Sequence, residues 1–148
     1  MRAILPGLLV AALLSAPFPG SAASGQTTAS IMTSGCYALD GDTLRCGSVR
    51  IRRVGIDAAE LPGHCRTGRY CAPGDPAAQR AALERLASGR LTILPLKLDK
   101  YQRMVARVRN AAGQDLSCAM IMAGATYRAD WDDKRIIART CPRIAAGG

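Results

Sequence analysis

Six cysteines constrain the folding of this chain more than any other feature, and all of them follow residue 35. In a chain exported to an oxidising compartment, an even number of cysteines predicts disulfides, although composition alone does not fix their pairing. A zinc site is the competing interpretation. It is disfavoured because no Cys-x-x-Cys pair occurs and His64 is the only histidine. The cysteines are Cys36, Cys46, Cys65, Cys71, Cys118 and Cys141.

The first residues predict export. Arg2 precedes an apolar run over residues 3–18, and small residues follow at 20–23, so residues 1–23 have the three parts of a signal peptide. A membrane anchor is the alternative, but prolines interrupt a run shorter than the roughly 20 residues that a span needs. We therefore expect a periplasmic or extracellular protein with no membrane span in the mature chain.

Composition divides the remaining chain and indicates its partners. Residues 24–34 are small and polar and predict a flexible lead-in, residues 35–141 predict one domain, and residues 142–148 form a tail. The formal net charge of +9 favours polyanions such as nucleic acid, or an anionic membrane surface. Ordinary solubility would also explain this charge, so charge alone does not choose a partner.

An Asp-Gly turn at residues 40–41 predicts a hairpin. A loop centred on Gly41 places Ala38 opposite Leu44 and Cys36 opposite Cys46. Opposed residues of an antiparallel pair lie within disulfide range, which predicts the bond Cys36–Cys46. Cys65–Cys71 would then close a short loop, and Cys118–Cys141 would hold the C-terminal tail.

The remaining pattern predicts two helices and three further strands. Strands are expected at 49–56, 91–98 and 104–108, with a long loop at 61–74. Asp75 and Pro76 begin a helix that ends at Gly89 and exposes Gln79, and Asp115 caps a second helix over 116–123. This order predicts an α+β protein built on a five-stranded, partly closed oligonucleotide-binding (OB) barrel. An unrelated disulfide-rich α+β domain is the alternative.

Four of the eleven acidic residues fall at the first turn and at the end of the third strand: Asp40, Asp42, Asp57 and Glu60. Ordinary turn chemistry explains Asp40 and Asp42 equally well. If the two segments are neighbours, however, carboxylates about 5 Å apart repel by roughly 3 kcal/mol at an effective dielectric near 20. A cation would relieve that repulsion, and hard carboxylate oxygens suit Ca²⁺ or Mg²⁺ better than zinc.

Three motifs, in this order and at these distances, resemble the staphylococcal (micrococcal) nuclease family. They are Asp40-Gly-Asp-Thr-Leu44, then Arg52 followed by Gly55-Ile-Asp-Ala-Ala-Glu60, and finally Asp99-Lys-Tyr-Gln-Arg103. The resemblance runs from about Cys36 to Tyr127. The cysteine-rich insert and tail are similar to those of exported bacterial members of the family.

This resemblance implies a monomeric, Ca²⁺-dependent nuclease on an OB barrel of the staphylococcal nuclease type, which cleaves DNA and RNA to leave 3′-phosphate ends. Its residue roles are carried over position by position. Asp42, Asp57 and the backbone carbonyl of Ala58 would bind the metal, with Asp40 in its outer shell. Glu60 would position or deprotonate the attacking water, Arg52 and Arg103 would hold the phosphate, and Lys100 and Tyr101 would contact the nucleotide's other phosphate.

The chain departs from the family pattern at three positions. Ala59 replaces a proline, and Gln102 replaces a glycine and is strained if its φ is positive. Arg53 replaces a core aliphatic residue and needs either a buried partner or an exit to solvent. These departures favour a rival hypothesis, a non-catalytic basic OB module with a vestigial metal site. A secreted interaction domain that uses charge alone is a further alternative.

Overall fold

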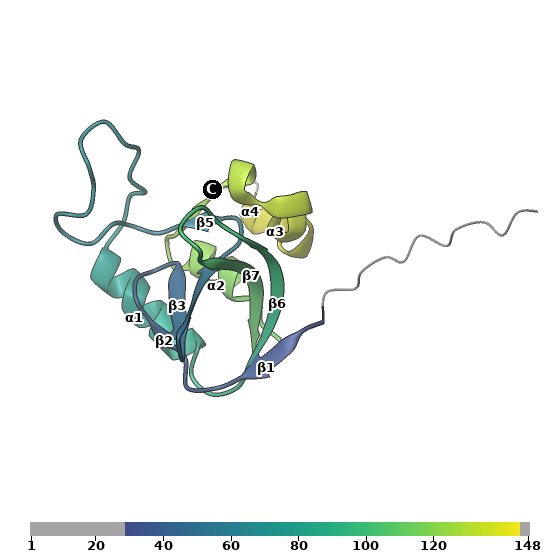
Figure 1. The fold of residues 1–148 in the computed structure, drawn as a ribbon. Coiled ribbons are helices and arrows are strands. Elements are labelled where there is room, and N and C mark those ends of the chain that lie inside the picture. The colour runs from purple at the N-terminus through teal and green to yellow at the C-terminus, as the bar shows by residue number, and fades with distance from the viewer. Residues whose placement is uncertain (1–28, 146–148) are drawn as a thin grey trace, which may run out of the picture.

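A curled six-stranded sheet forms the body of the fold in a computed structural model that describes residues 29–145 (Figure 1). All neighbouring strands pair antiparallel except β4 and β7, which run parallel. The strand order is β1 (Ile31–Thr33), β6 (Leu91–Leu98), β7 (Met104–Asn110), β4 (Val49–Arg53), β3 (Thr43–Cys46) and β2 (Tyr37–Ala38).

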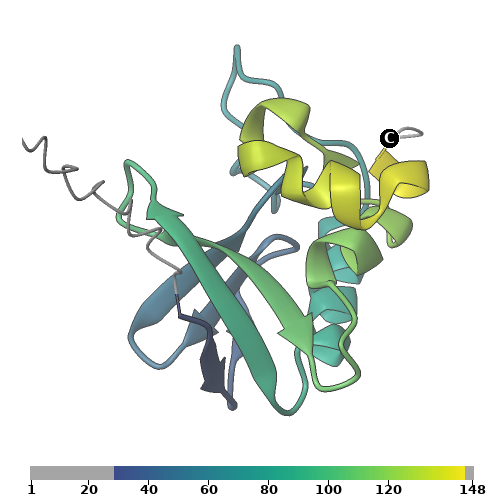
Figure 2. The ribbon, with the colours of Figure 1, turned by 90° about the vertical axis from the view of Figure 1, so that its right-hand side faces the viewer.

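The two edges of this sheet come from one short stretch of chain. β1 pairs with β6 and β2 pairs with β3, yet only residues 34–36 separate β1 from β2. The sheet therefore curls into a half-barrel, as Figures 1 and 2 show. Residues 31–33 were expected to lie in a flexible lead-in. That expectation was wrong for them, because their backbone pairs with β6.

The predicted third strand is two strands in the structure. β4 ends at Arg53, and β5 (Ile56–Asp57) pairs with β8 (Thr126–Tyr127) in a separate two-stranded sheet. Gly55 makes the break with a φ of 74°, and a Cβ added there would lie 2.9 Å from Ile137. A left-handed φ and this close approach both require glycine. The break turns Asp57 away from the main sheet.

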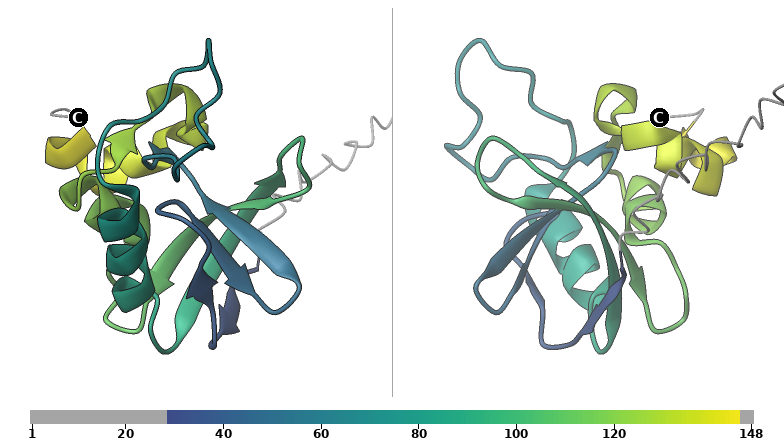
Figure 3. Two further views of the ribbon diagram at one scale, coloured as in Figure 1. Left: turned by 90° about the vertical axis from the view of Figure 1, so that its left-hand side faces the viewer. Right: turned by 45° about the vertical axis from the view of Figure 1, so that its right-hand side comes forward.

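The helices of the described chain are α1 (Pro76–Leu86), α2 (Leu116–Met122), α3 (Ile136–Thr140) and α4 (Pro142–Ala145). Two 3-10 turns, Ala129–Trp131 and Asp133–Arg135, precede α3. The side chains of Asp75 and Asp115 accept hydrogen bonds from the first backbone N–H groups of α1 and α2, as their sequence positions predicted. Figure 2 shows α2, α3 and α4 gathered at one end of the half-barrel, and the loop between β5 and α1 projects outward in Figure 3.

Two apolar clusters lie on opposite faces of the sheet. The larger fills the curl between the sheet, α1 and α2, and includes Leu44, Ile51 and Leu83. The smaller joins Val54 and Val105 to Ile137 under α3. Side chains of a strand alternate between faces, so β4 directs Ile51 into the large cluster and Arg52 away from it.

All three predicted disulfides are present. Cys36–Cys46 joins the ends of the β2–β3 hairpin with Cα atoms 4.3 Å apart, in the register that the Asp-Gly turn predicted. Cys65–Cys71 closes the projecting loop, and Cys118–Cys141 joins α2 to the end of α3. Such bonds are typical of proteins in oxidising compartments.

The ends of the chain fall partly outside the described residues. The predicted signal peptide, residues 1–23, lies outside them altogether, and so does the end of the predicted tail beyond residue 145. Within residues 29–145 no helix has the length and apolar content to cross a bilayer.

Gln102 has a φ of 59°, so the turn between β6 and β7 does require a left-handed residue. We expect Gln102→Gly to raise the free energy of unfolding by up to about 1 kcal/mol, because glycine removes the steric cost while adding some flexibility to the unfolded chain. Chemical denaturation of the oxidised protein measures this change. Gln114→Gly is the matched control, because the φ of Gln114 is not positive, and it should give no gain.

Candidate active site

Arg52 lies between Asp42 and Asp57, two of the three carboxylates that the sequence predicted to converge, whereas the third, Glu60, has no part in this ion-pair network. Nη1 of Arg52 donates to both oxygens of Asp42 at 2.9 and 2.8 Å, and its Nη2 donates to Oδ1 of Asp57 at 3.3 Å. Asp42 and Asp57 are only 5% and 8% exposed. The first turn, β4 and β5 thus bring three predicted site residues into one ion-pair network.

Local backbone structure explains why these groups meet. Thr43 pairs with Arg52 across β3 and β4, which places Asp42 beside Arg52. Oδ1 of Asp40 accepts hydrogen bonds from the backbone N–H groups of Asp42 and Thr43 at 2.9 and 2.7 Å, so Asp40 shapes the turn. A Cβ added at Gly41 would lie 2.6 Å from Cβ of Ala58, so only glycine lets the turn approach the loop after β5.

Burial and mutual repulsion disfavour the ionised forms of two carboxylates of the cluster, Asp40 and Asp57. Burial, followed by the charge of Asp42, raises the pKa of Asp40 to about 6. The same two causes raise the pKa of Asp57, although Arg52 opposes them. Burial alone would lower the pKa of Arg52, but the charges of Asp42 and Asp57 raise it. A further cation beside these carboxylates would lower the electrostatic energy of the site.

The donor set fits the Ca²⁺ that the resemblance implies. Within residues 29–145, no three Asp, Glu, His or Cys side chains are close enough to form a metal site by themselves. The expected set, however, takes only two carboxylates from side chains, and its third ligand is a backbone carbonyl. The N–H of Ala58 donates to Oδ2 of Asp42 at 3.3 Å, so Ala58 does lie at the cluster. Carboxylate and carbonyl oxygens suit Ca²⁺.

Glu60 is exposed, and it forms no ion pair with any residue that the structure describes. The loop before it is held by Gln79, whose Oε1 accepts from the N–H of Ala59 at 2.8 Å and whose Nε2 donates to the carbonyl of Gly124 at 2.7 Å. A proline at position 59 would have no N–H for this bond. The hydrogen bond therefore supplies part of the constraint that a proline ring would give.

The prediction that α1 exposes Gln79 was wrong, because Gln79 is 2% exposed. Gln79, Leu83 and Ala87 are spaced four residues apart and form the buried stripe of the helix. The prediction relied on the polar side chain of Gln79 and not on its helical spacing from Leu83. Counting the spacing back from Leu83 would have identified Gln79 as a buried residue.

The second expected arginine lies one strand away and forms a different ion pair. Nε of Arg103 donates to Oδ2 of Asp99 at 2.8 Å within the turn between β6 and β7. Lys100 and Arg103 both lie over the ring of Tyr101, at 5.1 and 5.3 Å from its centroid. In the described chain no ion pair joins this group to Asp42, Asp57 or Glu60. Met104, the first residue of β7, pairs with Ile51, so Arg103 directly precedes the strand beside β4.

Beside the cluster lies an aromatic and cationic group that the sequence did not predict. Nη1 of Arg128 lies 3.5 Å from Oδ2 of Asp57, and Nη2 of Arg128 donates to Asp130 at 2.8 Å. The guanidinium carbons of Arg128 and Arg52 lie over the ring of Trp131, at 3.9 and 4.8 Å from its centroid. No motif marks these residues, although Trp131 is the only tryptophan of the chain.

Arg53 is buried, with 1% exposure, and it lies on the opposite face of β4 from Arg52. Its Nη2 donates to the carbonyl of Gly41, its Nε to that of Asp42 at 3.4 Å, and its Nη1 to that of Leu116 at 3.2 Å. Burial lowers its pKa to about 10. Of the two alternatives, Arg53 thus has buried partners, a set of backbone carbonyls, and it supports the Gly41–Asp42 turn from inside the core.

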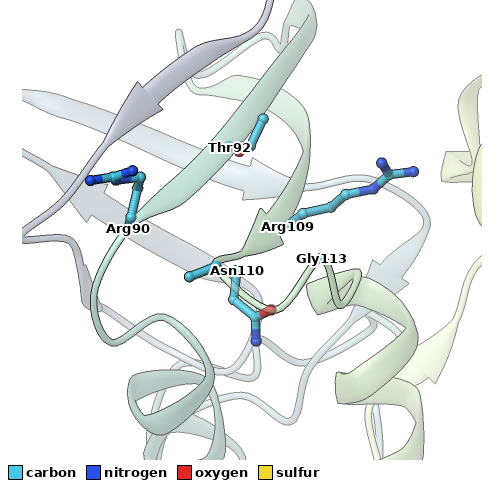
Figure 4. Close-up of a pocket in the computed structure, with 6 residues that line it drawn as sticks. Arg90, Thr92, Arg109, Asn110 and Gly113 are labelled. Carbon is cyan, nitrogen blue, oxygen red and sulfur yellow. The ribbon is translucent and has the colours of Figure 1, made fainter.

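An open pocket lies at the other end of the β6–β7 hairpin and does not include the cluster (Figure 4). Thr92 of β6 lines it together with Arg90, which directly precedes that strand, and Arg109 and Asn110 line it from β7. Figure 4 shows the guanidinium groups of Arg90 and Arg109 pointing away from each other. They do not converge on one anion, so we assign no function to this pocket.

Comparison with protein-family models and with curated proteins found no match for this chain. The resemblance to the staphylococcal nuclease family therefore rests on the three motifs. What the structure adds is a buried carboxylate and guanidinium network at the end of a curled sheet, formed by residues of the first two motifs.

Proposed function

We propose that the chain is an exported, Ca²⁺-dependent nuclease of the staphylococcal nuclease type, built on an OB barrel and cleaving DNA and RNA to 3′-phosphate products. The observation that carries the proposal is the network of Asp42, Arg52 and Asp57. These three residues come from two separate motifs of the resemblance, and they meet in one partly buried place. The near-closure of the sheet by β1 and β2 supports the barrel.

The side chains support hydrolysis of a phosphodiester in the following way. The carboxylate of Glu60 takes a proton from water as the water oxygen bonds to phosphorus. The bond from phosphorus to the 5′ oxygen breaks, that oxygen takes a proton from solvent, and the phosphate stays on the 3′ oxygen. Arg52 and Arg103 donate charge-assisted hydrogen bonds to the phosphoryl oxygens as negative charge builds on them.

A bound Ca²⁺ would supply electrostatic stabilisation of the phosphoryl oxygens. Asp42, Asp57 and the carbonyl of Ala58 would hold it, with Asp40 bonded to the turn behind them. Lys100 and Tyr101 lie exposed at the β6–β7 turn, where they would contact a neighbouring phosphate of the substrate. Asp99 keeps Arg103 in this turn through its ion pair.

A non-catalytic basic module that binds nucleic acid is the second candidate. The engagement of Arg52 with both carboxylates favours it, since a phosphate must compete with Asp42 and Asp57 for this guanidinium. Arg103 is likewise paired with Asp99. On this view the same surface binds the polyanion and no bond is cleaved.

Metal dependence separates these candidates. We expect the oxidised mature protein to cleave plasmid DNA and RNA with Ca²⁺ and to stop when a calcium chelator is added. Gel electrophoresis measures cleavage, and end-group analysis should find 3′-phosphate. Arg103→Ala should slow cleavage, whereas Arg109→Ala, an exposed arginine at the far end of β7, should not. Binding without cleavage under every metal condition would support the non-catalytic module instead.

A further inference from the structure

The outer face of β2, β3 and β4 carries a row of cationic and aromatic side chains, of which Arg45 is half-buried and Tyr37 and Arg50 are exposed. Tyr37 pairs with Arg45 across β2 and β3, and Arg45 pairs with Arg50 across β3 and β4. The alternate residues Ala38, Leu44 and Ile51 are almost fully buried in the core. Since neighbours along a strand face opposite sides, Tyr37, Arg45 and Arg50 share the outer face. Tyr37 is 46% exposed, and Arg50 is exposed as well.

This row continues into the candidate active site. Arg50 and Arg52 are two residues apart on β4 and therefore lie on the same face, about 7 Å apart along the strand. Ile51 pairs with Met104 in parallel register. The residues that precede them, Arg50 and Arg103, are therefore also neighbours. From Tyr37 to Arg103 the row crosses four strands, a distance of roughly 14 Å at the usual strand spacing.

Arg45 and Arg50 are not neutralised within residues 29–145, whereas Arg52 and Arg103, further along the row, are paired with aspartates. Directly opposed like charges such as Arg45 and Arg50 destabilise a sheet. Residues 43–56 contain no aspartate or glutamate, and neither arginine forms an ion pair with any residue from 29 to 145. Within the described residues, the guanidinium of Arg45 donates one hydrogen bond, from Nη1 to the carbonyl of Ser48 at 3.4 Å. An external anion that spans both guanidinium groups would remove this repulsion.

We propose that Tyr37, Arg45 and Arg50 form a tract that binds single-stranded nucleic acid on one side of the scissile phosphate. The proposal rests on the nuclease function proposed above and adds the path of the substrate. The two arginines bind successive phosphates, and the ring of Tyr37 stacks on a base at the end of the tract. Alternating phosphate contacts and base stacking is how single strands are bound without sequence preference. The row leads into the candidate active site, which favours a strand that passes through the site over a flat anionic membrane.

Binding is measured with a single-stranded oligonucleotide of about 8 nucleotides, within the roughly 4–16 that one OB fold covers. A calcium chelator is present, so the strand stays intact. We expect Arg45→Gln/Arg50→Gln to weaken binding roughly 10-fold and to reduce the slope of log affinity against log salt by about 1.4, or 0.7 for each lost contact. Tyr37→Leu should weaken binding without changing the slope.

Arg90→Gln/Arg109→Gln is the matched control, because it removes the same charge from the far end of the β6–β7 hairpin. Equal losses in both double variants would show that only net charge matters, and would overturn the tract. The tract would also be overturned if Arg45→Gln/Arg50→Gln lost its binding to anionic phospholipid vesicles while its affinity for the oligonucleotide stayed the same. Wild-type protein that binds the oligonucleotide through the tract but cleaves no substrate would contradict the proposed function alone.

Discussion

Glu60→Gln should lower kcat for DNA cleavage by roughly 10²- to 10⁴-fold, which is the usual contribution of a general base. Glutamine keeps the size of the side chain but cannot accept a proton from the attacking water. Glu60 is exposed, and no described residue pairs with it, so its replacement should leave the free energy of unfolding within about 0.5 kcal/mol of the original value. Cleavage kinetics and chemical denaturation of one preparation measure both quantities.

Glu84→Gln is the matched control, since Glu84 is the only other glutamate of the chain. It lies on α1, and its Oε2 accepts a hydrogen bond from the backbone N–H of Ala38. The amide oxygen of a glutamine can accept the same hydrogen bond. Its kcat should therefore stay close to that of the original protein. If Glu60→Gln cleaves as fast as Glu84→Gln, Glu60 is not the base. A rise in KM at constant kcat would assign Glu60 to substrate binding instead.

Local sequence signals predicted much of the fold because their partners lie nearby in the chain. The Asp-Gly turn gave the register of the β2–β3 hairpin and with it Cys36–Cys46. Asp75 and Asp115 gave the start of both longer helices. The end of β4 was not predictable in this way, because Gly55 turns the chain toward β8, more than sixty residues further on. β1 was missed for the same reason, since it pairs with β6, which is distant from it in the chain.

The site divides in the same manner. The convergence of Asp42 and Asp57 followed from a hairpin beside its neighbouring strand, and the structure joins them through Arg52. Gln79, Arg128 and Trp131 reach the site from α1 and from the C-terminal segment, where only the folded chain shows which side chains face the cluster. Residues that act through distant backbone groups leave no local signal in a sequence.

Arg53→Ala should lower the free energy of unfolding by about 3–5 kcal/mol, which would be a large fraction of the stability of a domain of this size. The substitution leaves a cavity in the core and removes the side-chain donors that reach the carbonyls of Gly41 and Leu116. Leaving a buried acceptor without a donor costs about 1–3 kcal/mol. Chemical denaturation with the disulfides intact measures the change. Arg139→Ala, at an exposed position of α3, is the control and should change stability by less than about 0.5 kcal/mol.

Arg53→Met separates the hydrogen bonds from the packing, because methionine restores most of the lost volume without any donor. Burial lowers the pKa of Arg53 to about 10, so part of the gain from its hydrogen bonds is offset by the cost of burying its charge. We expect a net loss of about 2 kcal/mol for Arg53→Met, because the backbone N–H of Arg53 still satisfies the carbonyl of Asp42 whereas the carbonyl of Gly41 loses its side-chain donor. A methionine variant as stable as the original protein would show that the hydrogen bonds to the carbonyls do not offset the cost of burying the charge of Arg53. Since Gly41 precedes Asp42, the loss should also slow cleavage at temperatures where the variant remains folded.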